Sequence, residues 1–249
     1  MQYGICSLSS ISLRHEPSSL SELVSQILYG EVFKILEARK QWSKIRLAFD
    51  SCEGWVNNEQ LVHIEKEAYD ALAKASSVLT TDLVEFVEDA SRQLYPITMG
   101  ATLNGLALLS HTYQGTKITG IQPKAALIPT ALLFLNTPYL WGGKTPFGID
   151  CSGFTQMVYK LCGYQLLRDA SQQVTQGEVL SFIEESEPGD LAFFDNEEGE
   201  IIHVGILLDH NYIIHAHGKV RIDQLDHSGI FNIEKQKHTH KLRVIKRMI

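Results

Sequence analysis

The chain has 249 residues, of which 44% are hydrophobic and 20% charged. It is long enough for one large domain or two small ones, and its composition is that of ordinary soluble proteins rather than disordered or collagenous chains. The 22 Lys and Arg residues against 29 Asp and Glu give a net charge of -7. That balance lacks the basic footprint of a protein that binds nucleic acid or anionic membrane, so neither is an expected partner.

The amino-terminal residues and the cysteines bear on the compartment. No apolar run reaches membrane-spanning length, and residues 1–10 lack a basic segment followed by a long apolar core. The four cysteines, Cys6, Cys52, Cys151 and Cys162, include no close pair typical of a disulfide framework or a zinc knuckle. Free thiols suit a reducing compartment, so we expect a cytoplasmic protein.

Residues 1–65 contain short apolar runs separated by turn residues, which is the pattern of a small β-barrel. The runs are Ile11–Arg14, Val32–Leu36, Trp42–Leu47 and Gly54–Val56. A polar stretch at Ser18–Glu22 predicts a loop, of a kind that often faces a ligand.

Residues 66–120 predict a second small β-rich region. We expect a helix at Tyr69–Lys74 and extended segments at Leu83–Val87 and Leu94–Ile97. The composition changes at Pro123, so we place the main boundary near Gly120 and a third region at 121–249.

Two helices are predicted at the start of this third region. Ala125–Leu135 is apolar almost all round, which indicates a buried helix. Asp150 is placed to begin the second helix, with Cys151 as its first residue and Gly163 just beyond its end. Cys162 lies on its apolar face and is assigned to the core.

Four strands are expected after the helices, at Asp190–Phe194, Ile201–Leu208, Tyr212–Ala216 and Leu242–Arg247. Helices followed by an antiparallel sheet make an α+β domain.

The chemistry centres on one thiol and two histidines. A helix start stabilises a thiolate through unpaired backbone N–H groups, so Cys151 is placed to act as a nucleophile. A three-residue turn at Asp209–Asn211 would pair residues whose numbers sum to 420, which places His215 opposite Gly205. His203 and His215 then lie diagonally on one face, close enough for one imidazole to orient the other.

Five motifs extend this pattern and occur in the order found in the NlpC-type papain-like cysteine peptidases, which the chain resembles. They are Pro138-Tyr139-Leu140-Trp141-Gly142-Gly143, Gly148-Ile149-Asp150-Cys151-Ser152-Gly153-Phe154, Gly189-Asp190-Leu191, His203-Val204-Gly205-Ile206 and Ile214-His215-Ala216. The resemblance implies a papain-like catalytic domain at 121–249.

Residue roles follow from this resemblance by position. It implies that Cys151 is the nucleophile, His203 the base and His215 the third polar residue of a catalytic triad. It also implies a set of pocket-lining residues, namely Tyr139, Asp150, Ser152, Arg168 and Asp169. For Trp141 we expect simple packing.

The first region resembles the bacterial SH3-like barrels that precede this catalytic domain in enzymes cleaving γ-D-glutamyl-L-diamino acid bonds of murein peptides; residues 66–120 are a candidate second barrel. The resemblance implies a murein tripeptide or tetrapeptide substrate, whose free L-Ala ammonium would pair with Glu22. Relatives commonly carry a tyrosine directly before Glu-Gly-Trp, whereas this chain has Cys52 there.

Two other functions remain compatible with the sequence. One is a weakly active module that binds wall fragments or proteins, and the other is an amidase or acyltransferase with the same triad. We expect no cofactor and no metal, because His238 and His240 lie among lysines typical of a basic solvated hairpin.

Overall fold

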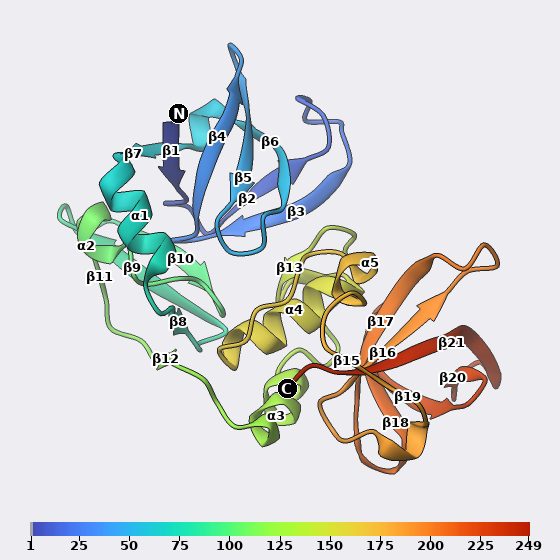
Figure 1. The fold of residues 1–249 in the computed structure, drawn as a ribbon. Coiled ribbons are helices and arrows are strands. Elements are labelled where there is room, and N and C mark those ends of the chain that lie inside the picture. The colour runs from blue at the N-terminus through green and yellow to red at the C-terminus, as the bar shows by residue number, and fades with distance from the viewer. Residues whose placement is uncertain (1) are drawn as a thin grey trace. The chain divides into compact units, whose positions relative to one another are not determined.

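The structure is a computed structural model that describes residues 2–249. The chain forms two compact units (Figure 1). The first contains the chain up to Ile121 together with Trp141–Pro146, and the second contains Gln122–Leu140 and Phe147–Ile249. The predicted α+β class, with an SH3-like barrel before a catalytic domain of helices and antiparallel strands, is confirmed.

Seven antiparallel strands of the first unit form the barrel, in the order β3-β2-β6-β5-β4-β1-β7. They are β1 (Gln2–Ile5), β2 (Ser10–Arg14), β3 (Leu23–Leu28), β4 (Val32–Ala38), β5 (Trp42–Leu47), β6 (Glu53–Asn57) and β7 (Val62–Ile64), with a 3-10 turn at Asn58–Gln60. Alternate side chains point inward because the side-chain period of a strand is two. Ile11, Leu13, Phe33 and Ile45 thereby form the fully buried centre of the barrel.

The rest of this unit adds short elements against the barrel. They are α1 (Lys66–Lys74), β8 (Val78–Thr80), β9 (Val84–Asp89), β10 (Leu94–Thr98), α2 (Leu106–Leu109), β11 (His111–Tyr113) and β12 (Lys117–Thr119). β9 pairs with β10 and β11, and β8 pairs with β12. Tyr29 from the barrel packs with Val87, Ile97 and Ala101, and its hydroxyl lies 2.8 Å from His111 Nδ1. The barrel and the region after it therefore share a core.

The second unit begins with a 3-10 turn at Lys124–Ala126 and α3 (Leu127–Leu132). The expected fully buried helix is wrong, because only one face of α3 is covered. Leu127 and Ala131 are buried, whereas Leu132 and Leu133 are 44% and 60% exposed. The covered face packs against α4 (Cys151–Leu161), and α5 (Ala170–Gln173) follows.

A curled antiparallel sheet completes this unit, in the order β15-β21-β16-β17-β18-β19-β20, with β21 also pairing with β20. The strands are β15 (Glu178–Leu180), β16 (Leu191–Asp195), β17 (Ile201–Leu207), β18 (Tyr212–His217), β19 (Lys219–Asp226), β20 (Gly229–Asn232) and β21 (Lys237–Arg247), with 3-10 turns at Ile183–Glu185 and Asp209–Asn211. Two-residue strands also occur at β13 (Lys144–Thr145) and β14 (Gly148–Ile149). The strands β15, β19 and β20 were not predicted from the sequence.

The predicted register of the central hairpin is confirmed. Gly205 on β17 pairs with His215 on β18, and Ile206 pairs with Ile214. This hairpin is the frame on which the two candidate catalytic histidines stand.

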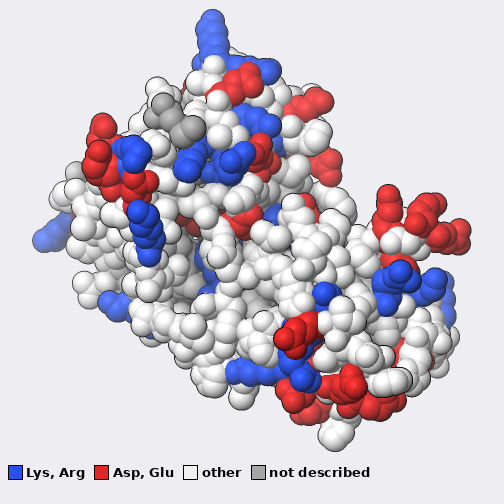
Figure 2. All heavy atoms as spheres, in the orientation of Figure 1, with Lys and Arg blue, Asp and Glu red and all other residues white. Residues whose placement is uncertain are grey.

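The described chain has neither a long apolar helix nor a single-sign charged face in the view of Figure 2. None of the helices in residues 2–249 is long and apolar enough to cross a bilayer. On the face shown in Figure 2, basic and acidic side chains are interspersed.

Candidate active site

The start of α4 is held by Asp150. Its side chain accepts a hydrogen bond from the Gly153 backbone N–H at 2.7 Å, which caps the helix as predicted. Both carboxylate oxygens also accept from the Arg168 guanidinium, at 3.1 and 2.6 Å. Arg168 is 2% exposed, so this is a buried bidentate ion pair. These contacts fix the start of the helix, and Cys151 is its first residue.

Cys151 is buried, and burial dominates its chemistry. Burial and the nearby Asp150 carboxylate raise the pKa of the thiol to about 12, although backbone hydrogen bonds at Val204 and Ser152 act in the opposite direction. The helix start thus favours the thiolate as expected, but burial outweighs it. The resting thiol is neutral, and it needs a base to become a nucleophile.

The candidate for that base lies on β17. The backbone of Val204 contacts the Cys151 sulfur, and the residue before it is His203. His203 is 5% exposed, and its pKa lies well below the ordinary value because the ring is buried and other histidines surround it. A neutral imidazole at this position can accept the thiol proton.

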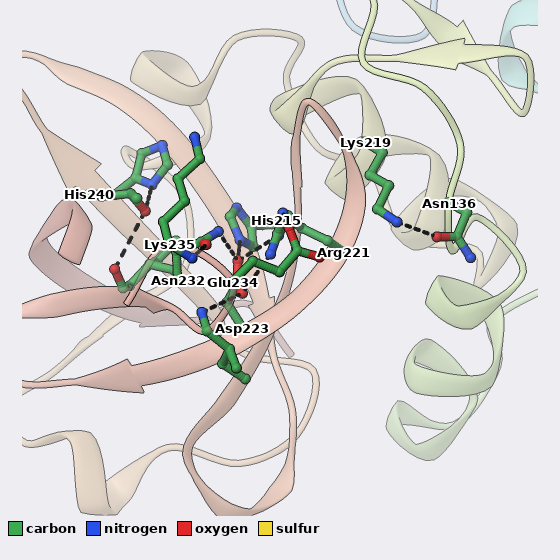
Figure 3. A network of polar contacts seen from close by, with 12 residues as sticks. Asn136, His215, Lys219, Arg221, Asp223, Asn232, Glu234, Lys235 and His240 are labelled. Carbon is green, nitrogen blue, oxygen red and sulfur yellow. Dashed lines mark hydrogen bonds and ion pairs between the residues drawn. The ribbon is translucent and has the colours of Figure 1, made fainter. Parts of the chain in front are cut away.

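A chain of polar contacts runs from His203 across three strands. His203 Nε2 lies 2.9 Å from His215 Nδ1, and His215 Nε2 lies 3.2 Å from Asp223 Oδ2 on β19. Figure 3 shows His215 and Asp223 at the centre of this network, with Arg221 beside them. Asp223 was not predicted from the sequence, because it lies on β19, a strand that the sequence pattern did not indicate. The alternation Arg221, Asp223 beside a histidine strand is the signal that could have identified it.

His240 also joins the cluster, and the prediction of a solvated hairpin is wrong for this residue. Its ring stacks on that of His203, with centroids 4.2 Å apart and an angle of 22° between planes. Burial lowers the pKa of His240 to about 3. The reason is the sheet: β21 pairs with β20 and carries His240 over the histidines. His238, by contrast, is exposed and pairs with Asp226 at 2.8 Å.

The three histidines bring one ligand nitrogen each within 4.8 Å of the others, as a metal site would require. Their ring geometry opposes that use. Metal ligation uses the in-plane nitrogen lone pair, and the stacked planes of His203 and His240 make those lone pairs run side by side instead of converging. The 2.9 Å contact between His203 and His215 is a hydrogen-bond distance. The arrangement fits a proton network better than a metal site.

Gly205 is required by the close approach of the two histidine strands. A Cβ atom added there would lie 2.9 Å from His215 Cβ and 2.7 Å from Ile213 Cδ1. Glycine therefore allows β18 to lie close enough for His215 to reach His203.

The other expected pocket residues of the second unit differ in their burial and contacts. Tyr139 pairs with Ile149, and its pKa is raised by burial and by the nearby Cys151 and Asp150. Ser152 Oγ accepts from Arg168 at 3.0 Å. Asp169 is exposed just before α5, where the Gln172 side chain accepts from its backbone N–H. Arg168 thus links Asp150 and Ser152 at the start of α4.

Glu22 lies in the first unit, where Trp141 holds it. The Trp141 indole donates a hydrogen bond to Glu22 Oε1 at 2.6 Å. Trp141 is 60% exposed, so the expectation that it simply packs is wrong. The close approach is possible because Gly142 adopts φ +76° against the Leu23 backbone, where a side chain would collide. Glu22 is therefore an oriented carboxylate at the surface of its unit.

A thiol at a helix start, with a histidine on a neighbouring antiparallel strand and a polar residue behind it, defines a papain-like cysteine peptidase. Comparisons with known proteins identify the families to which the two parts of the chain are similar. Residues 136–241 match the NlpC/P60 family, and residues 13–61 match the bacterial dipeptidyl-peptidase SH3 domain. The chain therefore carries an NlpC/P60 peptidase domain and a bacterial SH3 domain.

Individual proteins resemble the chain over different lengths. Dipeptidyl-peptidase 6 of Lysinibacillus sphaericus is 28% identical over 86% of this chain and 89% of its own length. The gamma-D-glutamyl-L-lysine dipeptidyl-peptidase of Bacillus subtilis is 41% identical over 36% of this chain and 31% of its own length. The crystal structure of an NlpC/P60 family protein from Bacillus cereus superposes with a TM-score of 0.82 at 22% identity, covering 99% of both chains. This last likeness concerns the fold.

Proposed function

We propose that the chain hydrolyses the γ-D-glutamyl-L-diamino acid bond of murein tripeptides and tetrapeptides that have a free amino-terminal L-Ala. The observation that carries the proposal is the cluster at the start of α4, where a buried thiol adjoins β17 and a histidine with a second histidine behind it. The name of the Bacillus subtilis relative supports the choice of a γ-D-glutamyl bond. A free thiol and a short soluble peptide suit the reducing cytoplasm, which is part of the proposal.

The proposed reaction proceeds through a thioester on Cys151. His203 takes the thiol proton as the sulfur attacks the γ-carbonyl carbon, and the oxygen gains negative charge near the Cys151 backbone N–H. The C–N bond then breaks, and His203 passes the proton to the leaving amine of the diamino acid. Water next attacks the thioester with His203 as base, which releases the L-Ala-γ-D-Glu dipeptide and restores the thiol.

Glu22 supplies substrate selection in this proposal. A carboxylate that already accepts one hydrogen bond from Trp141 keeps a second oxygen for the L-Ala ammonium. A peptide within an intact wall strand has no free amine at that position, so the requirement would restrict the enzyme to released peptides.

The test is incubation with L-Ala-γ-D-Glu-diaminopimelate and its L-Lys counterpart under reducing conditions, followed by mass spectrometry. Release of L-Ala-γ-D-Glu by the wild type, but not by Cys151→Ala, is expected. An N-acetylated peptide tests the free amine, and it should be cleaved much more slowly. Absence of dipeptide release from both free-amine peptides would overturn the proposed activity.

A further inference from the structure

The Asp223 carboxylate is fully buried and surrounded by hydrogen-bond donors. Oδ2 lies 3.2 Å from His215 Nε2 and accepts from Arg221 Nε at 2.7 Å and Asn232 Nδ2 at 3.2 Å. Oδ1 accepts from Arg221 Nη2 at 3.1 Å and the Ile233 backbone N–H at 3.3 Å. Burial alone would raise its pKa, but hydrogen bonds from His215 and Arg221 lower it to about 2. At neutral pH this group is ionised and can only accept.

An acceptor-only neighbour determines which nitrogen of His215 carries the proton. The nitrogen that faces Asp223 is Nε2, so Nε2 must be protonated. Burial lowers the pKa of His215 even beside the carboxylate, so its ring is neutral and Nδ1 bears the lone pair. Nδ1 faces His203 Nε2 at 2.9 Å and must therefore accept its proton. His203 is then left with its lone pair on Nδ1.

The geometry points to Asp223 as a positioning residue that fixes the proton tautomers of both histidines, so that His203 Nδ1 is the base offered to the Cys151 thiol. This role rests on the proposed thiol chemistry of the site, and it extends the triad by one residue on β19. Without the carboxylate, His215 could place its proton on Nδ1 and donate to His203 Nε2. His203 would then carry its proton on Nδ1, where it could not accept the one from the thiol.

Arg221 explains why His215 stays neutral although it lies beside an ionised carboxylate. The guanidinium holds Asp223 through two hydrogen bonds and also binds Glu234 at 3.0 Å (Figure 3). Its positive charge balances Asp223 and lowers the pKa of His215, because a second cation next to it is disfavoured. The ionisable groups that act on the two histidines, besides each other, come from three strands and are His217, Arg221, Asp223 and His240.

The first test measures the tautomers directly in the wild-type protein. Long-range proton–nitrogen NMR spectra of ¹⁵N-histidine-labelled protein distinguish a proton on Nδ1 from one on Nε2, with resonances assigned by single histidine variants. The expected result at neutral pH is Nε2–H for both His203 and His215. An Nδ1–H form of either ring would overturn the inference. This measurement needs no substrate, so it stands even if the proposed peptide is not cleaved.

The second test uses Asp223→Asn, with Glu234→Gln as the matched control because Glu234 binds the same arginine from an exposed position. The asparagine variant should lower kcat between about 10²- and 10⁴-fold with little change in KM, and should shift His215 toward Nδ1–H. Alkylation of Cys151 by iodoacetamide at neutral pH should slow in parallel, which reports on the thiol for any substrate. Glu234→Gln should match the wild type in kcat, in the His215 tautomer and in the alkylation rate.

A merely structural ion pair would give a different pattern. Asp223→Asn would then lower the melting temperature while leaving kcat, the alkylation rate and the tautomers of the folded protein unchanged, and that outcome would refute the role. If Asp223→Asn does not fold, the histidine tautomers measured by NMR in the wild-type protein alone decide whether the inference holds.

Discussion

The histidine network of the second unit and the Glu22–Trp141 pair of the first unit differ in how their side chains are held. His215 is fully buried, and both of its ring nitrogens have a partner on a neighbouring strand. Trp141 is 60% exposed, and one hydrogen bond joins it to Glu22. The proposed catalytic histidines are thus held by a sheet, whereas the proposed recognition group is held by one surface contact. Substitutions in the histidine network should therefore lower activity, whereas substitutions in the Glu22–Trp141 pair should change selectivity.

The largest effect is expected from removing the nucleophile. Cys151→Ala should abolish hydrolysis, by about 10⁴-fold or more, because no other group can form the thioester. Its circular dichroism spectrum should remain that of the wild type. Cys162→Ala is the matched control on the same helix: it removes a buried sulfur, so it should lower the melting temperature and leave kcat intact. Residual hydrolysis by the alanine variant at position 151 would contradict the assignment.

A smaller loss should follow from disturbing the spacing of the histidine strands. Gly205→Ala adds a methyl group 2.9 Å from His215 Cβ, so β18 must move and the His203–His215 hydrogen bond should lengthen. We expect kcat to fall about 10- to 100-fold with KM nearly unchanged, since a misplaced base loses efficiency by this order. Gly199→Ala, in the turn before β17, has open space around it but φ +83°, so it adds backbone strain without displacing β18 and controls for a general loss of stability. Equal kinetics for both variants would argue against tight coupling of the strands.

The recognition pair should respond in selectivity. Glu22→Gln removes the charge that would bind the L-Ala ammonium, and the loss of a charged hydrogen bond of about 1.5–3 kcal/mol predicts a rise in KM of about 10-fold or more. Trp141→Phe should give a smaller rise, because Glu22 keeps its charge but loses its anchor. Glu16→Gln, an exposed glutamate of the same loop, is the control. If N-acetylated and free peptides respond equally to Glu22→Gln, the proposed role of Glu22 fails.

The smallest effect concerns stability and pH. His240 has its pKa lowered from 6.5 to about 3, so the unfolded chain binds a proton there that the folded chain does not. Its contribution to stability is present above pH 6.5 and is lost as the pH falls toward 3. His240→Phe keeps an aromatic ring and should reduce the pH slope of the unfolding free energy by up to about 1.4 kcal/mol per pH unit in this window.

Urea unfolding at several pH values measures that slope. Leu242→Met, on the same strand and without a titratable group, should keep the wild-type slope. Identical slopes for the wild type and His240→Phe would show that His240 is not kept neutral by the fold.

The elements closest in sequence to the motifs were the most predictable. Asp150 as helix cap, Cys151 as first helical residue and the pairing of Gly205 with His215 follow from local rules of capping and strand registration. Asp223 and His240 do not, because they reach the site through β19 and β21, whose pairing depends on contacts distant in sequence. The exposed face of α3 was missed for a related reason: an apolar sequence indicates what could be buried, but not how much surface is available to cover it.

The short segment Trp141–Pro146 limits how freely the two units can be exchanged. It belongs to the first unit, although the residues on both sides of it belong to the second. Lys144 is fully buried there, with its Nζ 3.5 Å from Glu31 Oε1 and its backbone N–H donating to Gln26 Oε1 at 2.7 Å. A catalytic domain excised as one continuous piece would take this lysine without its carboxylate. A replacement barrel would therefore have to supply an acid at the position of Glu31 to keep this contact.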